Sequence, residues 1–117
     1  MTVSKKSISV ILPNFNGKDL LEEFIPSIIE ALHFSNLEYE FIVIDDHSTD
    51  NSVAYLQQQF PSINIIENKN NKGFSYSCNK GIEKATKDLV FLVNSDVKLS
   101  INYFENQLNY FDFRYRY

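Results

Sequence analysis

Polar residues that could do chemistry occur at three places in the sequence, each directly after an apolar run. The three segments are Pro13-Asn14-Phe15-Asn16-Gly17, Asp45-Asp46-His47-Ser48-Thr49-Asp50 and Asn94-Ser95-Asp96. An aromatic ring beside amides can stack on a nucleobase and hydrogen-bond its edge. A carboxylate can accept an imide N–H or a ribose hydroxyl, and it can hold Mg²⁺ or Mn²⁺ together with phosphate oxygens and water. Together these residue types are typical of a nucleotide site with a divalent cation.

Each segment also has a local explanation that needs no ligand. The first can be a turn with Phe15 in the core, and the third can be a plain turn. Asp50 is better explained as the cap or first-turn acid of a following helix. His47 in a loop is more often polar surface than a metal ligand. The adjacent pair Asp45 and Asp46 is harder to explain locally, because burial of unpaired carboxylates is costly.

Hydrophobic periodicity predicts the elements that hold these segments. Buried strands are expected at residues 7–12, 39–44, 63–66 and 89–93, and amphipathic helices at 17–34, about 50–60, 74–85 and 101–111. Pro26 lies inside the first helical stripe and should kink that helix or mark a late start. Because the run at 89–93 is apolar throughout, we expect this strand to be central in a larger sheet.

The alternation of strands and helices predicts an α/β fold, with a Rossmann-like parallel sheet and helices on both faces. In such sheets ligands bind beyond the carboxyl ends of the strands. We therefore expect the three polar segments to meet at one edge of the sheet. A dinucleotide fold would need G-x-G-x-x-G after the first strand, and Gly17 is the only glycine there.

Composition excludes several classes of function. The chain has 117 residues, which fits one domain, and its net charge of −4 and pI of about 5.1 argue against nucleic acid as a partner. Its single cysteine, Cys78, fits a reducing compartment, and we interpret it as a buried, inert thiol. Neither a membrane-spanning run nor a signal peptide is recognisable, so the expected location is cytoplasmic.

Read together, the motifs resemble family 2 glycosyltransferases, which have a GT-A fold. The similar segments are SVILPNFNG at 9–17, IVIDDHSTDNS at 42–52, Asn71-Lys72-Gly73-Phe74 followed by Asn79 and Gly81, and LVFLVNSD at 89–96. They occur in the family's order and spacing over about residues 7–100. The chain is similar to the N-terminal part of such an enzyme, which binds the nucleotide-sugar donor.

The resemblance implies a role for each matching residue. Nucleotide-binding positions would be Pro13, Asn14, Phe15, Asn16, Asp45, Asp46, Lys72, Gly73, Asn79, Asn94 and Ser95. Phe15 would stack on the base, the two acids would contact uracil and ribose, and Asp96 would hold Mg²⁺ or Mn²⁺. Asn94 stands where the family's D-x-D motif has its first acid, which leaves one carboxylate for the ion. The implied donor is a nucleoside-diphosphate sugar, with UDP the expected nucleotide.

The family's catalytic base, an Asp or Glu well downstream that deprotonates the acceptor, has no counterpart here. Glu105 and Asp112 come too soon in the chain. We therefore expect a donor-binding portion that lacks the acceptor-binding half, carries no catalytic residue and transfers no sugar. An unpaired edge beside 89–93, and an apolar helix surface, should promote self-association. The helix residues concerned are Phe104, Leu108, Phe111 and Phe113. Peripheral attachment of the complete enzyme to a membrane stays open.

The strongest rival is a receiver domain of a signalling response regulator, which is also a doubly wound α/β fold. Against it, the phosphoacceptor position would fall on Val93, and the acid pair would have to follow the first strand. A nucleotidyltransferase would need a Gly-rich phosphate loop that is absent. A ligand-free interaction module is a further alternative. The sequence does not identify the sugar, the acceptor or the pathway.

Overall fold

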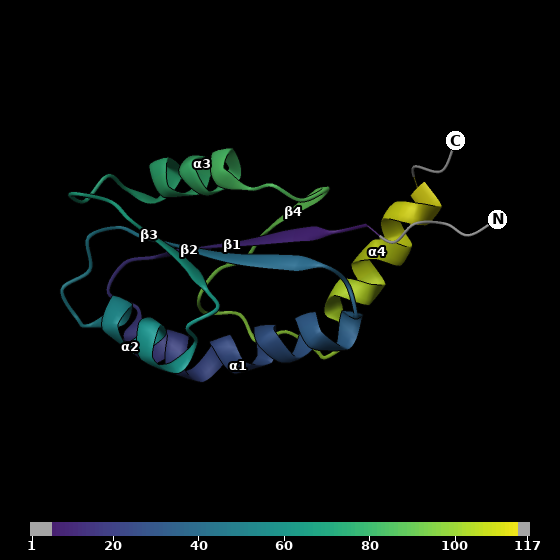
Figure 1. The fold of residues 1–117 in the computed structure, drawn as a ribbon, viewed down its shortest axis with the longest axis horizontal. Coiled ribbons are helices and arrows are strands. Elements are labelled where there is room, and N and C mark those ends of the chain that lie inside the picture. Colours follow the sequence, from purple (N-terminus) through teal and green to yellow (C-terminus); the bar gives the residue numbers. More distant parts are fainter. Residues whose placement is uncertain (1–5, 115–117) are drawn as a thin grey trace.

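The structure is a computed structural model that describes residues 6–114, with side chains through Leu108. Strands and helices alternate along the chain (Figure 1). The elements are β1 (Ile8–Asn14), α1 (Lys18–Ser35), β2 (Tyr39–Asp45), α2 (Ser52–Gln59), β3 (Asn64–Glu67), α3 (Phe74–Lys84), β4 (Leu89–Leu92) and α4 (Tyr103–Arg114). All eight expected elements are present, and their ends lie within three residues of the predicted ones.

The four strands form one parallel sheet in the order β3-β2-β1-β4. This matches the first part of the Rossmann order, in which strand 1 lies between strands 2 and 4. Receiver domains have the flavodoxin-like order, in which strand 1 lies between strands 2 and 3. The acid pair also follows β2 and not β1. The receiver interpretation is therefore wrong.

The strand at 89–93 is not central in the sheet that the structure describes, and it has the unpaired edge expected beside it. β4 pairs with β1 alone, and the central strands are β1 and β2. Its side chains alternate between a buried Phe91 and the exposed Val90 and Leu92. A continuous apolar run predicts burial on both faces, but here only the face toward α1 is covered.

Helices cover both faces of the sheet, as expected. Figure 1 shows α3 on one face and α1 with α2 on the other. The larger core lies under α1 and α2, where alternate residues of β1 and β2, such as Val10 and Val43, pack against Leu21 and Ile28 of α1. The smaller core lies under α3. Its buried residues are Ile11, Ile42 and Ile44.

Pro26 does not delay the first helix. α1 runs without interruption from Lys18 to Ser35, and Pro26 is exposed on its outer surface. Proline removes one backbone N–H donor from the helix, and at an exposed position the carbonyl left without a partner can be hydrated. Leu21, Ile25, Ile28 and Leu32 bury one face of α1 along its length. This burial stabilises the helix on both sides of the proline.

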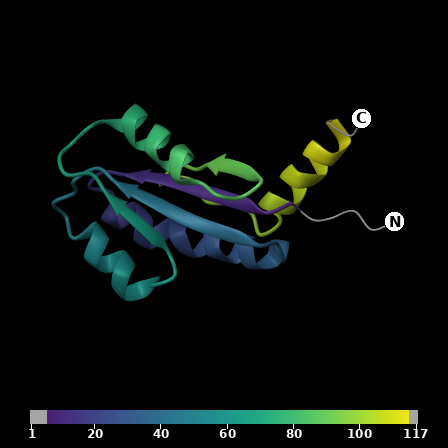
Figure 2. The same cartoon turned by 45° about the horizontal axis from the view of Figure 1, so that its top comes forward.

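The chain after β4 returns along α1, so α4 lies at the far end of the molecule from the loops that follow β1 and β2 (Figures 1 and 2). The Leu99 N–H donates to Ser27 Oγ of α1 at 3.2 Å, and Leu99 is buried. Phe104 is fully buried and stacks edge-to-face on Phe91, with ring centroids 5.3 Å apart. The expectation that Phe104 forms an exposed surface is therefore wrong.

Leu108 is half-buried against the same core, and the side chains of Phe111 and Phe113 lie outside the described residues. Across the part of the chain that the structure describes, no helix combines the length and the apolar character needed to cross a membrane.

Candidate functional site

The carboxyl ends of β1 and β2 are joined by a buried carboxylate. Asp45, the last residue of β2, accepts a hydrogen bond from Asn14 Nδ2 at 2.9 Å. It also accepts from the Ser48 N–H at 2.8 Å and from Ser48 Oγ at 2.7 Å. Both Asn14 and Asp45 are almost fully buried. Asp45 therefore has its partners within the protein, and it fixes the loop after β2 to the end of β1.

Asn16 makes a second connection between these two loops. Its N–H donates to Ser48 Oγ at 2.9 Å, and its Oδ1 accepts from the Thr49 N–H at 2.7 Å. Its backbone is left-handed, with φ of 51°, a conformation that asparagine tolerates better than most residues. This geometry turns the chain sharply after β1, and the Phe15 ring is left exposed beside the loop.

Asp50 holds the first turns of two helices. It accepts from the Lys18 N–H of α1 at 2.9 Å and from the Ser52 N–H of α2 at 3.0 Å, and also from Ser52 Oγ. Burial raises the pKa of this carboxyl, but these hydrogen bonds outweigh burial and leave the pKa below its ordinary value. The N-cap residue of α2 is Asn51 and not Asp50. Asp50 stands one residue earlier and accepts from the first backbone N–H of each helix, so its role at the helix start is local, as expected, and extends to a second helix.

Asp46 holds the loop that enters α3. Its Oδ1 accepts from Asn68 Nδ2 at 2.9 Å and from the Lys72 N–H at 2.7 Å, and its Oδ2 accepts from the Gly73 N–H at 2.9 Å. Asn68 Nδ2 donates also to Ser77 Oγ of α3 at 3.0 Å. Burial raises the pKa of Asp46, and the hydrogen bonds from Lys72, Asn68 and Gly73 lower it below its ordinary value.

Gly73 is required by the path of this loop. Its φ of 96° and ψ of 169° lie in a region that is essentially restricted to glycine. In this conformation its N–H points at Asp46 and its carbonyl accepts from the Ser77 N–H at 3.2 Å, which starts α3. The loop and the first turn of α3 are thus fixed to the end of β2.

A cavity of about 250 Å³ opens between these loops at the carboxyl edge of the sheet. Its lining comes from the ends of β1 and β2, the loop before α3 and the first turn of α3. The lining residues are Pro13, Asn14, Phe15, Asp46, Asn71, Gly73, Phe74 and Ser77. Phe15 is 52% and Phe74 60% exposed, so two aromatic rings are available to a bound molecule. The cavity combines flat apolar surfaces with a charged acceptor, which suits a nucleobase.

The structure thus brings many of the predicted nucleotide-binding residues to one place. Those that line the cavity are Pro13, Asn14, Phe15, Asp46 and Gly73. Asn16 and Asp45 do not line it, and their hydrogen bonds connect the loops after β1 and β2. Lys72 contributes its backbone N–H to Asp46, while its ammonium lies 5.9 Å from the ring centroid of Tyr76 on α3.

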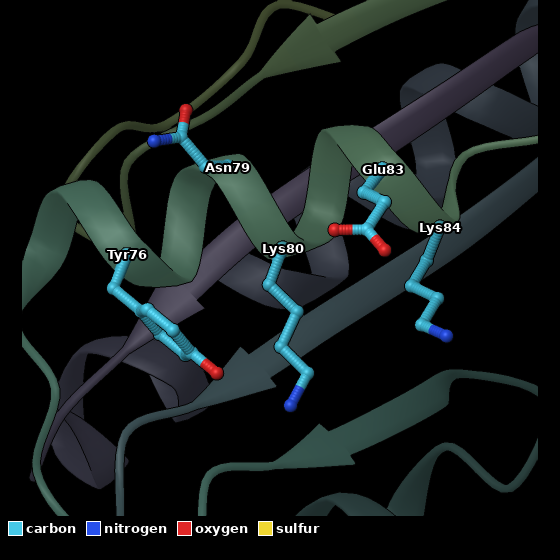
Figure 3. A pocket seen from close by; sticks show the side chains of 5 residues that line it. All are labelled: Tyr76, Asn79, Lys80, Glu83 and Lys84. Carbon is cyan, nitrogen blue, oxygen red and sulfur yellow. The ribbon is translucent and has the colours of Figure 1, made fainter.

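Asn79 is not among the residues that line this cavity. It lies one turn further along α3 and borders a separate hollow of about 280 Å³ with Tyr76 and Lys80. Figure 3 shows its amide pointing away from the flank of α3 that carries these two side chains. Asn79 can therefore border the nucleotide, as predicted, only if the nucleotide extends beyond the cavity.

The third polar segment follows β4 and lies beside the first. A Cβ placed on Gly17 would be 3.7 Å from Ser95 Oγ, so these two loops are neighbours. The same Cβ would be 2.6 Å from the buried Asn14 Oδ1, which is too close, and this explains why residue 17 is a glycine. Asn94 and Asp96 are exposed. The three segments therefore meet at one edge of the sheet, as the topology predicts.

Asp96 offers a hard oxygen ligand of the kind that Mg²⁺ and Mn²⁺ prefer. No group of three or more His, Cys, Asp or Glu side chains that could hold a metal ion occurs among the residues that the structure describes. An ion at Asp96 would therefore depend on ligand phosphate and water for most of its coordination, which magnesium sites commonly do. The exposed carboxylate of Asp96 fits such an ion.

Sequence reasoning missed four polar or aromatic residues of this region. Asn71, Phe74 and Ser77 line the cavity, and Asn68 supports Asp46 from behind. The sequence did contain a signal for Phe74. It is an aromatic residue directly after a turn glycine, at the start of a helix, and the residues of that helix that face the core lie at other positions. His47 is exposed, as expected for polar surface, and its backbone is left-handed, with φ of 65°. Cys78 lies on the buried side of α3, and burial raises the pKa of its thiol.

The fold and this edge define a Rossmann-like α/β domain with a cavity beyond the carboxyl ends of its strands. The family model for Glycosyl transferase family 2 matches residues 9–116, and the chain therefore belongs to this family. The protein TuaG of Bacillus subtilis, named as a teichuronic acid biosynthesis glycosyltransferase, is 32% identical over 94% of the chain and 44% of its own length. Poly(ribitol-phosphate) beta-N-acetylglucosaminyltransferase TarP of Staphylococcus aureus is 32% identical over 90% of the chain and 33% of its own length.

Solved structures share the fold. Residues 1–349 of TarS from S. aureus, in complex with UDP-GlcNAc, superpose with a TM-score of 0.79 at 23% identity, over 91% of this chain and 31% of that one. The mannosyltransferase PcManGT of Pyrobaculum calidifontis, in complex with GDP-Man and Mn²⁺, gives 0.74 at 22% identity, over 91% and 32%. They confirm the α/β fold that the sequence predicts. The chain spans less than half the length of these relatives.

Proposed function

We propose that this chain binds the donor of a family 2 glycosyltransferase, a nucleoside-diphosphate sugar with UDP as the nucleotide. The observation that carries this proposal is the cavity of about 250 Å³ in which Phe15 and Asp46 meet. An aromatic face can stack on a pyrimidine, and a carboxylate with a lowered pKa stays ionised and can accept an imide N–H. The complex of TarS with UDP-GlcNAc supports a uridine nucleotide.

In this proposal the diphosphate extends from the cavity toward the loop after β4. Ser95 lies next to Gly17 on this path, and Asp96 follows directly. Asp96 would hold the Mg²⁺ or Mn²⁺, which would neutralise charge on the diphosphate leaving group. The complex of PcManGT with GDP-Man and Mn²⁺ supports a divalent cation in the family.

The complete reaction would transfer the sugar to an acceptor hydroxyl with inversion, which requires a general base on the acceptor side. Two candidate acids of the chain, Glu105 and Asp112, lie in α4, at the far end of the molecule from the donor cavity (Figure 1). We therefore propose that residues 6–114 bind the donor and do not by themselves activate the acceptor.

The proposal also covers the class of pathway, the cellular location and the partners of the protein. The names of TuaG and TarP support polysaccharide biosynthesis as the class of pathway. The single cysteine fits a reducing compartment, and a cytoplasmic location would suit it. The negative net charge gives no support to a nucleic-acid partner.

Calorimetry with UDP, with and without Mn²⁺, tests the donor site. We expect Mn²⁺ to strengthen binding, and Asp96→Ala to remove this gain while weak metal-free binding remains. Glu105→Ala is the matched control, because Glu105 is an exposed acid at the other end of the molecule. If UDP binds equally well with and without Mn²⁺, the role of Asp96 is wrong. If UDP does not bind under either condition, the donor-site proposal fails.

A further inference from the structure

Phe74 has surroundings that its position in α3 does not explain. It is the first residue of α3, and 60% of its surface is exposed. The residues of α3 that pack against the sheet begin further along, at Ser77, Cys78 and Gly81. Exposed apolar side chains scattered singly need no explanation. Phe74, however, lines the same cavity as a second exposed aromatic ring, that of Phe15.

The two rings reach the cavity from different strand ends. Phe15 follows β1 and is held by the hydrogen bonds that Asn16 makes to the loop after β2. Phe74 follows the loop after β3 and is held by the hydrogen bonds from the Lys72 and Gly73 N–H groups to Asp46. Asp46 therefore both faces the cavity and fixes the backbone that presents Phe74.

We propose that Phe74 is a second stacking surface for the nucleobase, in the cavity that Phe15 also lines, and that Asp46 positions it. This inference rests on the proposed donor site and adds a residue that determines its affinity for the base. Two rings on loops that are anchored separately by hydrogen bonds can both contact one flat base. Stacking of a base on one aromatic ring is worth a roughly 5- to 150-fold change in affinity.

Tryptophan fluorescence gives a direct test, because the chain contains no Trp. In Phe74→Trp the single indole would stack on the base, so UDP should quench its emission along a saturable curve. The midpoint should equal the dissociation constant measured by calorimetry on the same variant. Tyr76→Trp is the matched control, since Tyr76 is exposed on the same helix and does not line the cavity. Its emission should not respond to UDP.

Calorimetry on Phe74→Ala gives an independent measurement. We expect UDP and UMP to bind roughly 5- to 150-fold more weakly, by the same factor, because both carry the base. Phe74→Tyr should retain wild-type affinity, and Phe74→Ala should unfold at the wild-type temperature because the ring is largely exposed.

The outcomes separate this inference from the donor site itself. If wild-type protein binds UDP and Phe74→Ala binds it equally well, the stacking role of Phe74 is overturned while the donor site stands. The stacking role is also overturned if calorimetry shows that UDP binds Phe74→Trp but the emission of this variant does not change. If the wild-type protein binds no UDP, the donor site and the inference fail together.

Discussion

At the scale of single residues, three aspartates lie within six positions at the end of β2, and their neighbours give them different roles. Asp45 is buried and joins two loops, Asp50 accepts from the first backbone N–H of two helices, and Asp46 faces the cavity while it holds the entry to α3. Buried carboxylates are stable in a fold only when they accept several hydrogen bonds, and all three do. The loop is therefore built around its acids, and Asp46 is the one that a ligand can reach.

Asp46→Asn should lower the free energy of unfolding at pH 7 by about 1–3 kcal/mol, because the amide places a donor against the Lys72 or Gly73 N–H. Its pKa is lower in the folded protein than its ordinary value. The stability that the charged form contributes is therefore complete above about pH 4 and is lost as the pH falls through the folded pKa. Urea unfolding between pH 2 and pH 7 measures this, and the variant should depend less on acid pH than the wild type.

Asp19→Asn is the control for this measurement. Asp19 is an exposed acid in the first turn of α1 and makes no hydrogen bond among the described residues. Its substitution should change stability by no more than about 0.5 kcal/mol. Asp50 also has a lowered pKa, so some acid dependence remains in every variant. Equal acid dependence in Asp46→Asn and wild type would contradict the role given to Asp46.

Gly73→Ala should cost about 1–3 kcal/mol through backbone strain alone. A Cβ on Gly73 would meet no atom within 4 Å, so the cost comes from its φ of 96°. Because the strain falls on the turn before α3, the variant should also bind UDP more weakly. Urea unfolding and calorimetry on the same sample measure both effects. Full stability would show that the loop has another conformation available.

At the scale of elements, sequence periodicity predicted all eight, because each carries a clear pattern of apolar residues. It placed the three polar segments at one edge, because parallel strands share a direction. It could not show that only one face of β4 is covered, since an apolar run has the same appearance whether one face is covered or two. It could not show that Phe104 is buried, because the return of the chain along α1 depends on the contacts of Leu99. The support of Asp46 by Asn68 joins residues far apart in sequence and has no local pattern.

The contact between α3 and the sheet gives a prediction at this scale. A Cβ on Gly81 would be 2.3 Å from Ile11 Cγ2 and 3.2 Å from Ile44 Cγ1. Gly81→Ala should therefore destabilise the fold by about 1–3 kcal/mol, despite the better helix propensity of alanine. Adding Ile11→Leu removes the Cγ2 atom and should restore part of the loss. Urea unfolding of the two single variants and the double variant checks this, and additive effects would show that the two residues are not in contact.

At the scale of the whole molecule, the edge of β4 that faces away from β1 is the place where two copies can pair. The Leu89 and Val93 N–H groups donate to Ser7 and Ile11 of the β1 side at 3.1 and 2.9 Å. In a parallel ladder the intervening residues point their backbone groups the other way, so those of Val90 and Leu92 face outward. Their side chains are 42% and 47% exposed. Natural edges are usually protected by charge, proline or a bulge, and this one carries none of these between 89 and 92.

We therefore predict that the chain self-associates through β4, with two edges paired. The paired segment is four residues long, so the dimer should be weak and should form with rising concentration. Because Phe104 of α4 is buried in the core of the same molecule, we expect the edge of β4, and not this ring, to make the contact between two copies. Leu92→Lys should give a monomer with unchanged stability, since an exposed charge blocks edge pairing without removing core contacts. Light scattering over a concentration series measures the mass, with Ile101→Lys, an equally exposed position off the edge, as the control. A wild-type monomer at every concentration would disprove the association, and a Leu92→Lys dimer would show that another surface makes it.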